Sequence, residues 1–341
     1  MTFSLRDLAV PLVGAPMAGG PGTAALAAAV SNAGGLGFLA AGYLTAEKFA
    51  EMIAATRSLS TGPIGVNLFV PQPSVATDAA LHHYRELLAP LAARYGAELG
   101  VPHADDDAWQ AKLDVVADTA PEVVSFTFGC PAPEVLARLR NRGVLTTVTV
   151  TSVEEAGIAV AAGADALVVQ GPEAGGHRGT FDPARRPGEI PLDVLLAQIG
   201  AAHDIAVIAA GGIATAADVR RVLDAGAAAA QAGTAFLCSD EAGTNPVHRQ
   251  ALSDPAFSHT VVTCAFSGRY ARGLANDFTE RFDPVAPLGY PDVNQMTGAM
   301  RRAAVAAGDP HGTNLWAGTA WRATTAGSAA DIVAAMTREV R

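Results

Sequence analysis

Short apolar runs rich in branched side chains recur along the chain, separated by stretches with helical character. Such runs predict buried strands, and their alternation with helices predicts βα units and a parallel sheet. Eight runs fit this description: Leu12–Pro16, Leu36–Ala40, Ile64–Val70, Val123–Phe128, Leu145–Val150, Asp165–Gln170, Ala206–Ala210 and Ala228–Ala232. Eight is the number of strands that a (β/α)8 TIM barrel requires, so an α/β barrel is the predicted fold.

Two segments carry the same helix signals in the same register. Ser152-Val-Glu-Glu155 predicts a capping box, and Gly163 is placed to end that helix. Thr215-Ala-Ala-Asp218 opens another helix, which Gly226 would end. This repetition favours a barrel built of βα modules. The alternative, an open doubly wound sheet, is less favoured because no G-x-G-x-x-G follows the first strand.

Two longer segments interrupt the alternation. Residues 71–121 are too long for one helix and predict two helices, split by the polar Pro102–Asp107 segment. Residues 239–327 follow the eighth strand and predict a mainly helical cap over the barrel mouth. We therefore expect a barrel over residues 1–238, a cap and substrate segment over 239–327, and a helix over 328–341 that returns to the barrel.

Composition excludes several classes of partner. The net charge of −10 is spread along the chain, which argues against a nucleic-acid surface. Cys130, Cys238 and Cys264 form no C-x-x-C, so neither a disulfide framework nor a metal site is expected. No apolar run reaches the ~18 residues that a membrane span needs, and the first residues do not resemble a signal peptide. A cytoplasmic protein is expected, and a homodimer is compatible with this composition.

A glycine-rich loop with one histidine follows the sixth predicted strand. It runs from Gln170 to Gly179 and contains Gly175, Gly176 and His177. Ligands of α/β barrels bind beyond the C-terminal ends of the strands. Glycine lets the backbone approach a flat ligand closely, and histidine titrates near neutrality. This loop is the first candidate for a catalytic segment.

A glycine pair after the seventh predicted strand and a Gly-Thr step after the eighth indicate a phosphate site. Gly211-Gly212 follows the seventh strand and Gly233-Thr234 follows the eighth. In this fold, backbone N–H groups at these two positions commonly cradle a phosphate. Three amides, Asn67, Gln170 and Gln231, stand where they could pair with the edge of a heterocycle. A phosphate cradle together with amides predicts flavin mononucleotide (FMN).

Four segments, in this order and spacing, resemble the class I nitronate monooxygenases, formerly called 2-nitropropane dioxygenases. They are Ala15–Gly20, Gly65–Phe69, Gln170–Gly179 and Ala209–Gly212, and the resemblance extends from about residue 11 to residue 321. It implies an FMN-dependent barrel that oxidises alkyl nitronates, such as propionate 3-nitronate, with dioxygen to a carbonyl compound and nitrite. One departure is Thr319, where the family often has glutamine.

The resemblance also implies roles for individual residues. His177 would be the catalytic base, either removing the α-proton of a nitroalkane or orienting a nitronate that is already ionised. In the second case a protonated imidazole would also attract the anion. Flavin contacts are expected at Ala15, Pro16, Met17, Asn67, Gln170, Gly175, Gly176, Gly211, Gly212, Gln231, Ala232, Gly233 and Thr234.

Two other functions remain open at this point. One is an FMN- and NAD(P)H-dependent enoyl-acyl-carrier-protein reductase, a related flavin barrel with a similar Glu-Ala-Gly-Gly-His loop. The other is a flavin- or phosphate-binding regulatory protein without catalysis. The presence of an intact His177 argues against this second alternative. Tyr270 and Tyr290 of the cap are equally compatible with a substrate pocket and with packing. Asp105–Asp107 is expected to be a solvated loop.

Overall fold

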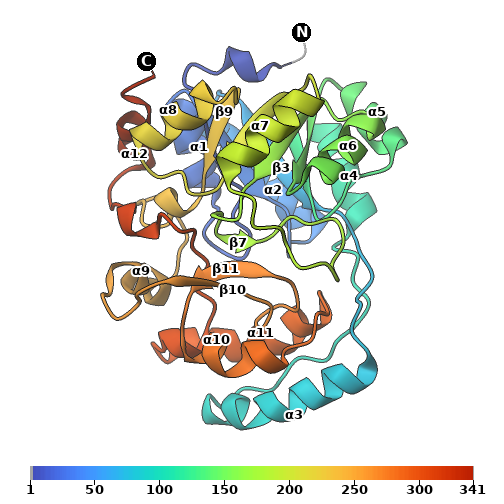
Figure 1. The fold of residues 1–341 in the computed structure, drawn as a ribbon, viewed down its shortest axis with the longest axis vertical. Helices are drawn as coiled ribbons and strands as arrows, with labels where there is room; N and C mark the ends of the chain where they lie inside the picture. The colour runs from blue at the N-terminus through green and yellow to red at the C-terminus, as the bar shows by residue number, and fades with distance from the viewer. Residues whose placement is uncertain (1–2, 341) are drawn as a thin grey trace.

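A closed barrel of eight parallel strands forms the centre of the computed structural model, which describes residues 3–340 (Figure 1). The strands follow one another around the barrel in chain order, from β1 to β9, and only the short β7 lies outside it. The barrel strands are β1 Leu12–Gly14, β2 Leu36–Ala40, β3 Ile64–Phe69, β4 Val123–Thr127, β5 Leu145–Val150, β6 Ala166–Gln170, β8 Ala206–Ala210 and β9 Ala229–Ala232. All eight predicted strands are confirmed.

Helices cover the outside of the barrel. Their apolar faces pack on the strands, so the main core lies between the sheet and the helical ring. The ring consists of α1 Ala24–Asn32, α2 Ala46–Leu59, α4 Trp109–Thr119, α5 Pro133–Arg140, α6 Val153–Ala162, α7 Leu192–Ala202, α8 Ala216–Asp224 and α12 Ala329–Thr337. Helix α12 packs against α1 and α8. The last described helix thus lies beside the first helix of the ring.

The two predicted helix starts differ in detail. Thr215 and Asp218 form the complete capping box. Ser152 accepts a hydrogen bond from the backbone of Glu155 at 3.1 Å, but the Glu155 carboxylate does not return to Ser152. It instead accepts from the backbone of Thr151 at 2.6 Å and of Phe181 at 2.8 Å. The capping box predicted there is thus only half formed, because Glu155 anchors the loop that follows His177.

The cap contains strands as well as helices. Strands β10 Thr260–Thr263 and β11 Ala271–Leu274 pair antiparallel, and β11 also pairs with β7 Gly176–His177. The sequence analysis did not predict this three-stranded sheet. Three helices complete this part of the cap: α9 Pro246–Ser253, α10 Asp277–Phe282 and α11 Asp292–Ala306. The segment that carries His177 is therefore an edge strand of the cap sheet.

One cap helix comes from the middle of the barrel sequence. Helix α3 Asp78–Arg94, between β3 and β4, lies at the far end of the molecule, beside α11 (Figure 1). Its buried Tyr84, Leu88 and Ala92 pack against apolar side chains from the segment 265–300, so α3 shares the core of the cap. The predicted split of residues 71–121 into two helices is confirmed, but the first of them extends the cap rather than the barrel.

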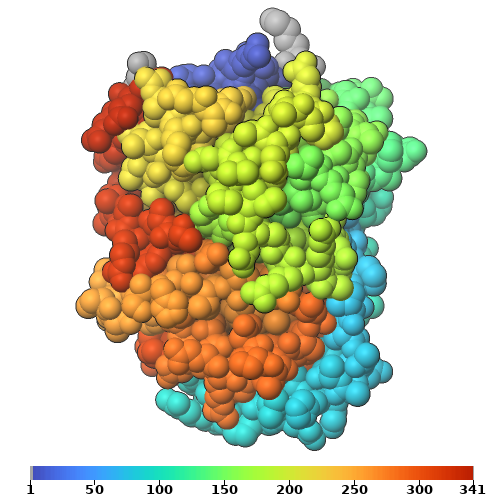
Figure 2. Space-filling view, in the orientation of Figure 1, coloured from blue at the N-terminus to red at the C-terminus, as the bar shows by residue number. Residues whose placement is uncertain are grey.

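Both described chain ends lie on the side of the barrel opposite the cap (Figure 1). In the space-filling view, the segment after β7 rests directly on the cap (Figure 2). Among residues 3–340, no helix is long and apolar enough to cross a membrane. The remaining short elements are 3₁₀ turns: η1 Leu5–Asp7, η2 Thr234–Phe236, η3 Asp283–Val285, η4 Pro310–Gly312 and η5 Trp321–Ala323.

Candidate active site

His177 is held at the junction of barrel and cap by hydrogen bonds on both sides. The Gln170 side chain at the end of β6 donates to the carbonyl of His177 at 3.0 Å and accepts from the backbone N–H of Gly179 at 2.9 Å. On the other side, His177 pairs with Ala271 of β11. The glycine-rich loop is thus closed over Gln170, and the position of the imidazole is fixed.

Aromatic rings surround the imidazole. Its centroid lies 5.8 Å from that of Phe128, 5.9 Å from Tyr290 and 5.6 Å from Trp316. Its Nε2 lies 2.8 Å from the Ser267 hydroxyl, which itself donates to the carbonyl of Arg269 at 3.1 Å. Because the single hydroxyl proton is used in that bond, the arrangement favours a donating Nε2–H. Nδ1 is then the ring nitrogen left to accept a proton.

The surroundings keep this imidazole neutral. Burial, followed by the positive charges of Arg269 and Arg301, lowers the pKa of His177 to about 3. Arg269 is buried and Arg301 is half-buried, and within the described chain neither pairs with a carboxylate. Arg269 stacks on Phe128 at 4.0 Å and donates to Gln72 at 2.8 Å. The attraction for an anion therefore comes from the arginines rather than from a protonated histidine.

This lowered pKa predicts how stability depends on pH. Between about pH 6.5 and pH 3 the unfolded chain binds a proton at His177 that the folded protein does not bind. The free energy of unfolding should therefore fall as the pH drops through this window, and it should fall less in His177→Asn. Urea unfolding of both proteins at about pH 7 and about pH 4.5 measures the difference. His248, whose pKa is lowered to about 4, contributes the same pH dependence to the wild type and to the variant, so its effect cancels in the comparison. If both proteins lost the same free energy of unfolding between the two pH values, His177 would not be desolvated in the folded state.

The two predicted halves of the phosphate cradle lie at neighbouring strand ends. Gly211 and Gly212 follow β8 with φ of 118° and 67°, and Gly233 precedes the short helix η2. The backbone N–H groups of Gly212, Gly233 and Thr234 have no hydrogen-bond partner within residues 3–340. Three unpaired donors at one edge of the barrel fit a phosphate group.

Other predicted site residues border this cradle. A Cβ on Gly233 would lie 3.2 Å from the Ala15 side chain and 3.6 Å from the sulfur of Met17, so the segment after β1 adjoins it. A Cβ on Gly212 would lie 3.7 Å from the Thr319 hydroxyl. Thr319, which departs from the family pattern, therefore stands near the cradle and not beside His177.

The remaining predicted residues differ in how free they are to bind a ligand. Asn67 uses its amide N–H groups within the barrel, on Ser125 Oγ at 2.8 Å and Thr127 Oγ1 at 3.0 Å, so its carbonyl oxygen is the end left for a ligand. Gly175 packs tightly on the backbone of residues 317–318, whereas a Cβ on Gly176 would meet nothing within 4 Å. Gln231, Ala232 and Pro16 lie on the same C-terminal face of the barrel, with β9 paired to β1.

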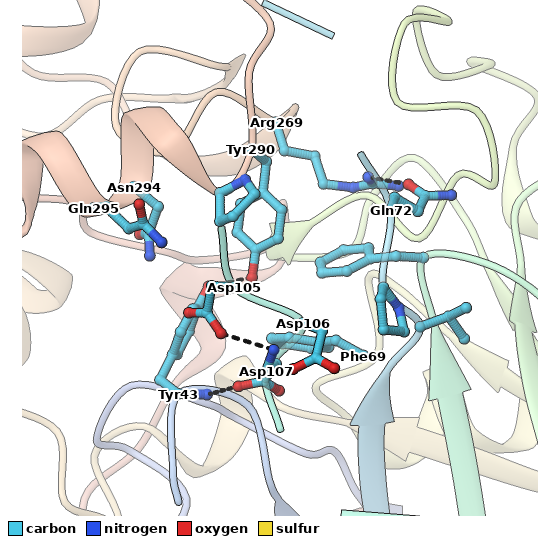
Figure 3. A pocket seen from close by; sticks show the side chains of 14 residues that line it. Tyr43, Phe69, Gln72, Asp105, Asp106, Asp107, Arg269, Tyr290, Asn294 and Gln295 are labelled. Carbon is cyan, nitrogen blue, oxygen red and sulfur yellow. Dashed lines mark hydrogen bonds between the residues drawn. The ribbon is translucent and has the colours of Figure 1, made fainter. Parts of the chain in front are cut away.

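A pocket beside His177 contains Tyr290, which the sequence left open between pocket and packing, and several residues that the sequence analysis did not select. It is lined by Tyr43, Phe69, Gln72, Phe128, Arg269 and Tyr290, with Asp105–Asp107 and residues 291–295 at its edge (Figure 3). Tyr43 and Phe128 adopt left-handed backbone conformations, with φ of 68° and 78°. Bulky residues rarely do so, and such strain gathers at functional sites. No sequence signal marks these two positions, because neither is glycine or asparagine.

The acidic segment is only partly the solvated loop that was expected. Asp105 and Asp106 are exposed, but Asp107 forms an ion pair of 2.7 Å with Lys112, whose side chain is buried. Asp107 also accepts from the backbone N–H of Tyr43 at 3.0 Å, and the Tyr43 hydroxyl lies 3.5 Å from that of Tyr290 (Figure 3). This segment therefore fixes one wall of the pocket. In the described part of the chain, no cluster of side chains suits a metal ion.

Comparison with known proteins identifies the family. A family model described as nitronate monooxygenase matches residues 4–339. The chain is 38% identical to a nitronate monooxygenase from Pseudomonas aeruginosa, over 99% of this chain and 98% of that one. It is 40% identical to another from Paraburkholderia phytofirmans, over 97% and 92%. The chain belongs to the nitronate monooxygenase family. It is therefore an enzyme of the oxidoreductase class.

Solved structures agree with this family assignment. A nitroalkane oxidase from Streptomyces ansochromogenes superposes with a TM-score of 0.95 at 48% identity, covering 98% of this chain and 97% of that one. FabK from Thermotoga maritima is less similar, with a TM-score of 0.76 at 27% identity, covering 98% and 94%. The resemblance to nitronate monooxygenases drawn from the sequence is confirmed, and so is the barrel fold.

Proposed function

We propose that this protein oxidises alkyl nitronates, such as propionate 3-nitronate, with dioxygen to a carbonyl compound and nitrite, using bound FMN. The observation that carries the proposal is the neutral imidazole of His177. It stands among three aromatic rings at the ligand-binding end of the barrel, in the field of Arg269 and Arg301. This environment suits a small anion that has apolar substituents.

The residues of the site fit the proposed cofactor. We infer that Gly211, Gly212, Gly233 and Thr234 hold the phosphate through backbone N–H groups, beside Ala15, Pro16 and Met17. Asn67 would offer its carbonyl oxygen to the flavin ring, and Gln170, Gly175, Gly176, Gln231 and Ala232 would line the same edge. FMN, when bound, accepts electrons from the nitronate and passes them to dioxygen. The protein supplies binding, orientation and charge.

His177 is proposed as the group that handles the substrate proton. Neutral at pH 7, it can take the α-proton of a nitroalkane, and the imidazolium so formed would lie beside the nitronate that it produced. That anion offsets the effect of the arginines, because an opposite charge nearby favours the protonated ring. A nitronate that arrives already ionised needs no base, and the ring, held by Ser267, then only orients it.

The remaining expectations complete the proposal. We propose a barrel over residues 1–238, a substrate-binding cap over 239–327 and a returning helix over 328–341, with α3 as an added part of the cap. We also propose a cytoplasmic enzyme that acts on small molecules. A homodimer is compatible with this proposal.

Purified protein tests the cofactor and the reaction together. It should be yellow and should release FMN on denaturation. Mixing it anaerobically with propionate 3-nitronate should bleach the flavin, and readmitted dioxygen should restore the colour while nitrite accumulates. Rapid bleaching by NADPH alone would instead support the reductase alternative. A colourless protein that takes up no added FMN would contradict the whole proposal.

A further inference from the structure

A second cavity lies on the opposite face of the strand that carries His177. Successive residues of an extended strand point to opposite sides of a sheet. The His177 ring packs against Phe128 and Tyr290, which line the pocket described above. The next residue, Arg178, lines a cavity of about 400 Å³ between the loop after β7 and the cap. The two cavities share no lining residue. A volume of this size suits a small metabolite.

The cavity is rich in guanidinium groups that form no ion pair in the described chain, although the carboxylates of Glu173 and Glu189 lie near enough to offset part of their charge. Arg178, Arg186 and Arg272 line it, together with Tyr270 and two carboxylates, Glu189 and Asp283. Asp283 is already engaged, because it accepts from the Thr263 hydroxyl at 2.6 Å and from the backbone N–H of Cys264 at 3.0 Å. Within residues 3–340, none of the three arginines lies in an ion pair, whereas the neighbouring Arg185 pairs with Glu154 at 3.0 Å.

Arg178 is the most informative of the three. It is only 2% exposed, yet its Nε has no hydrogen-bond partner in the described chain. Arg272, on the adjacent strand, donates to the carbonyl of Pro172 at 2.8 Å and to the Thr260 hydroxyl at 3.0 Å. Burial, followed by the charge of Arg272, lowers the pKa of Arg178 to about 10. A buried, unpaired charge is costly, and a ligand anion would remove that cost.

We propose that this cavity is a second binding site, for a phosphorylated or carboxylated small molecule. The anionic group binds between Arg178 and Arg272, and Arg186 contacts it from the loop. The apolar side chains of Val262, Ala286 and Leu288 take the rest of the ligand. The site is separate from that of the proposed oxidation, since none of its lining residues lines the pocket beside His177 or belongs to the proposed cradle. One backbone contact joins the two, because the carbonyl of Arg178 accepts from Arg269 at 3.5 Å. Because Arg272 lies on β11, opposite Gly176, the ligand also ties the His177 strand to the cap.

Titration calorimetry with inorganic pyrophosphate and with citrate tests the proposal. The protein is used as the FMN-loaded enzyme, so that the phosphate cradle is filled, at constant sodium chloride. At least one of the two probes should bind saturably, with one equivalent per chain. Pyrophosphate alone would identify a phosphate site, and citrate alone a carboxylate site. Absence of saturable binding of both below ~10 mM would overturn the proposal, since ~10 mM corresponds to only about −2.7 kcal/mol.

Variants of neighbouring residues locate the site. Arg178→Gln should weaken binding about tenfold or more, because a charge-assisted hydrogen bond is lost. Arg186 is exposed, so Arg186→Gln should fold normally and weaken binding about two- to fivefold. Glu189→Gln should tighten binding, since it removes a negative charge from the cavity wall. Arg185→Gln is the matched control and should leave affinity unchanged.

The pattern of these changes decides the outcome. Equal losses in Arg185→Gln and Arg186→Gln would mean attraction to surface charge, and the proposal would be wrong. Unchanged affinity in Arg178→Gln would contradict it as well. If Arg178→Gln does not fold, the opposite shifts expected for Arg186→Gln and Glu189→Gln still decide the question.

Discussion

Gly212→Asp is expected to fold but to be purified without flavin. The substitution adds a carboxylate beside the unpaired backbone N–H of Gly212, within the proposed cradle, so it should repel the phosphate and compete for that donor. Losing two charge-assisted hydrogen bonds, each contributing about 1.5–3 kcal/mol, should weaken FMN binding about 100-fold or more. FMN released on denaturation, per mole of protein, measures the effect.

Gly212→Asn is the control that separates charge from backbone strain. Gly212 has a φ of 67°, and a Cβ there would lie 3.0 Å from that of Glu173, so any side chain is tight at this position. Asparagine and aspartate have similar shapes and tolerate left-handed φ about equally. Asn should therefore reproduce the steric cost and retain much more FMN than Asp. Equal flavin loss in both variants would mean that shape matters and that no phosphate binds there.

The barrel could be predicted from the sequence because its signals are local. Each strand is a short branched run, and its helix carries its own cap or glycine stop, as Thr215, Asp218 and Gly226 do in α8. Eight such units in succession leave few alternatives to a barrel. The signal of Gly211-Gly212 is equally local, since a positive φ next to a strand end has few substitutes for glycine.

The cap could not be predicted to the same degree, because its structure depends on contacts between residues that are far apart in the sequence. Strands β10 and β11 have four residues each, and β7 has two, so no periodicity develops. They form a sheet only because the loop after β6 meets the cap. Helix α3 was predicted, but the pattern that predicts a helix does not show which surface it covers. Its partners, such as Phe266 and Met296, lie about two hundred positions later in the chain.

The surroundings of His177 illustrate the same limit. The loop composition singled out the histidine, but its neutrality depends on Arg269 and Arg301, and its orientation on Ser267. All three lie in the cap, in segments with no motif of their own. Tyr43 is fixed by Asp107, which from the sequence was expected to be solvated. Charge and orientation at the site are therefore properties of the tertiary fold.

His177→Asn is expected to separate proton removal from substrate binding. Asparagine keeps a polar side chain within the loop clamped by Gln170, so the variant should fold and retain FMN. It cannot take a proton at neutral pH. If His177 removes the α-proton, kcat/KM for a neutral nitroalkane should fall about 100-fold or more, as expected for a positioned general base.

Preformed nitronates provide the comparison within the same variant. They arrive already deprotonated, and the attraction from Arg269 and Arg301 survives the substitution, so their kcat/KM should fall much less. Steady-state rates on a nitroalkane and on its own nitronate, measured at one pH with matched flavin content, give the two losses directly. Equal losses on both substrates would mean that the imidazole binds and orients the anion rather than ionising its precursor. Undiminished rates on both would mean that His177 takes no part in the reaction.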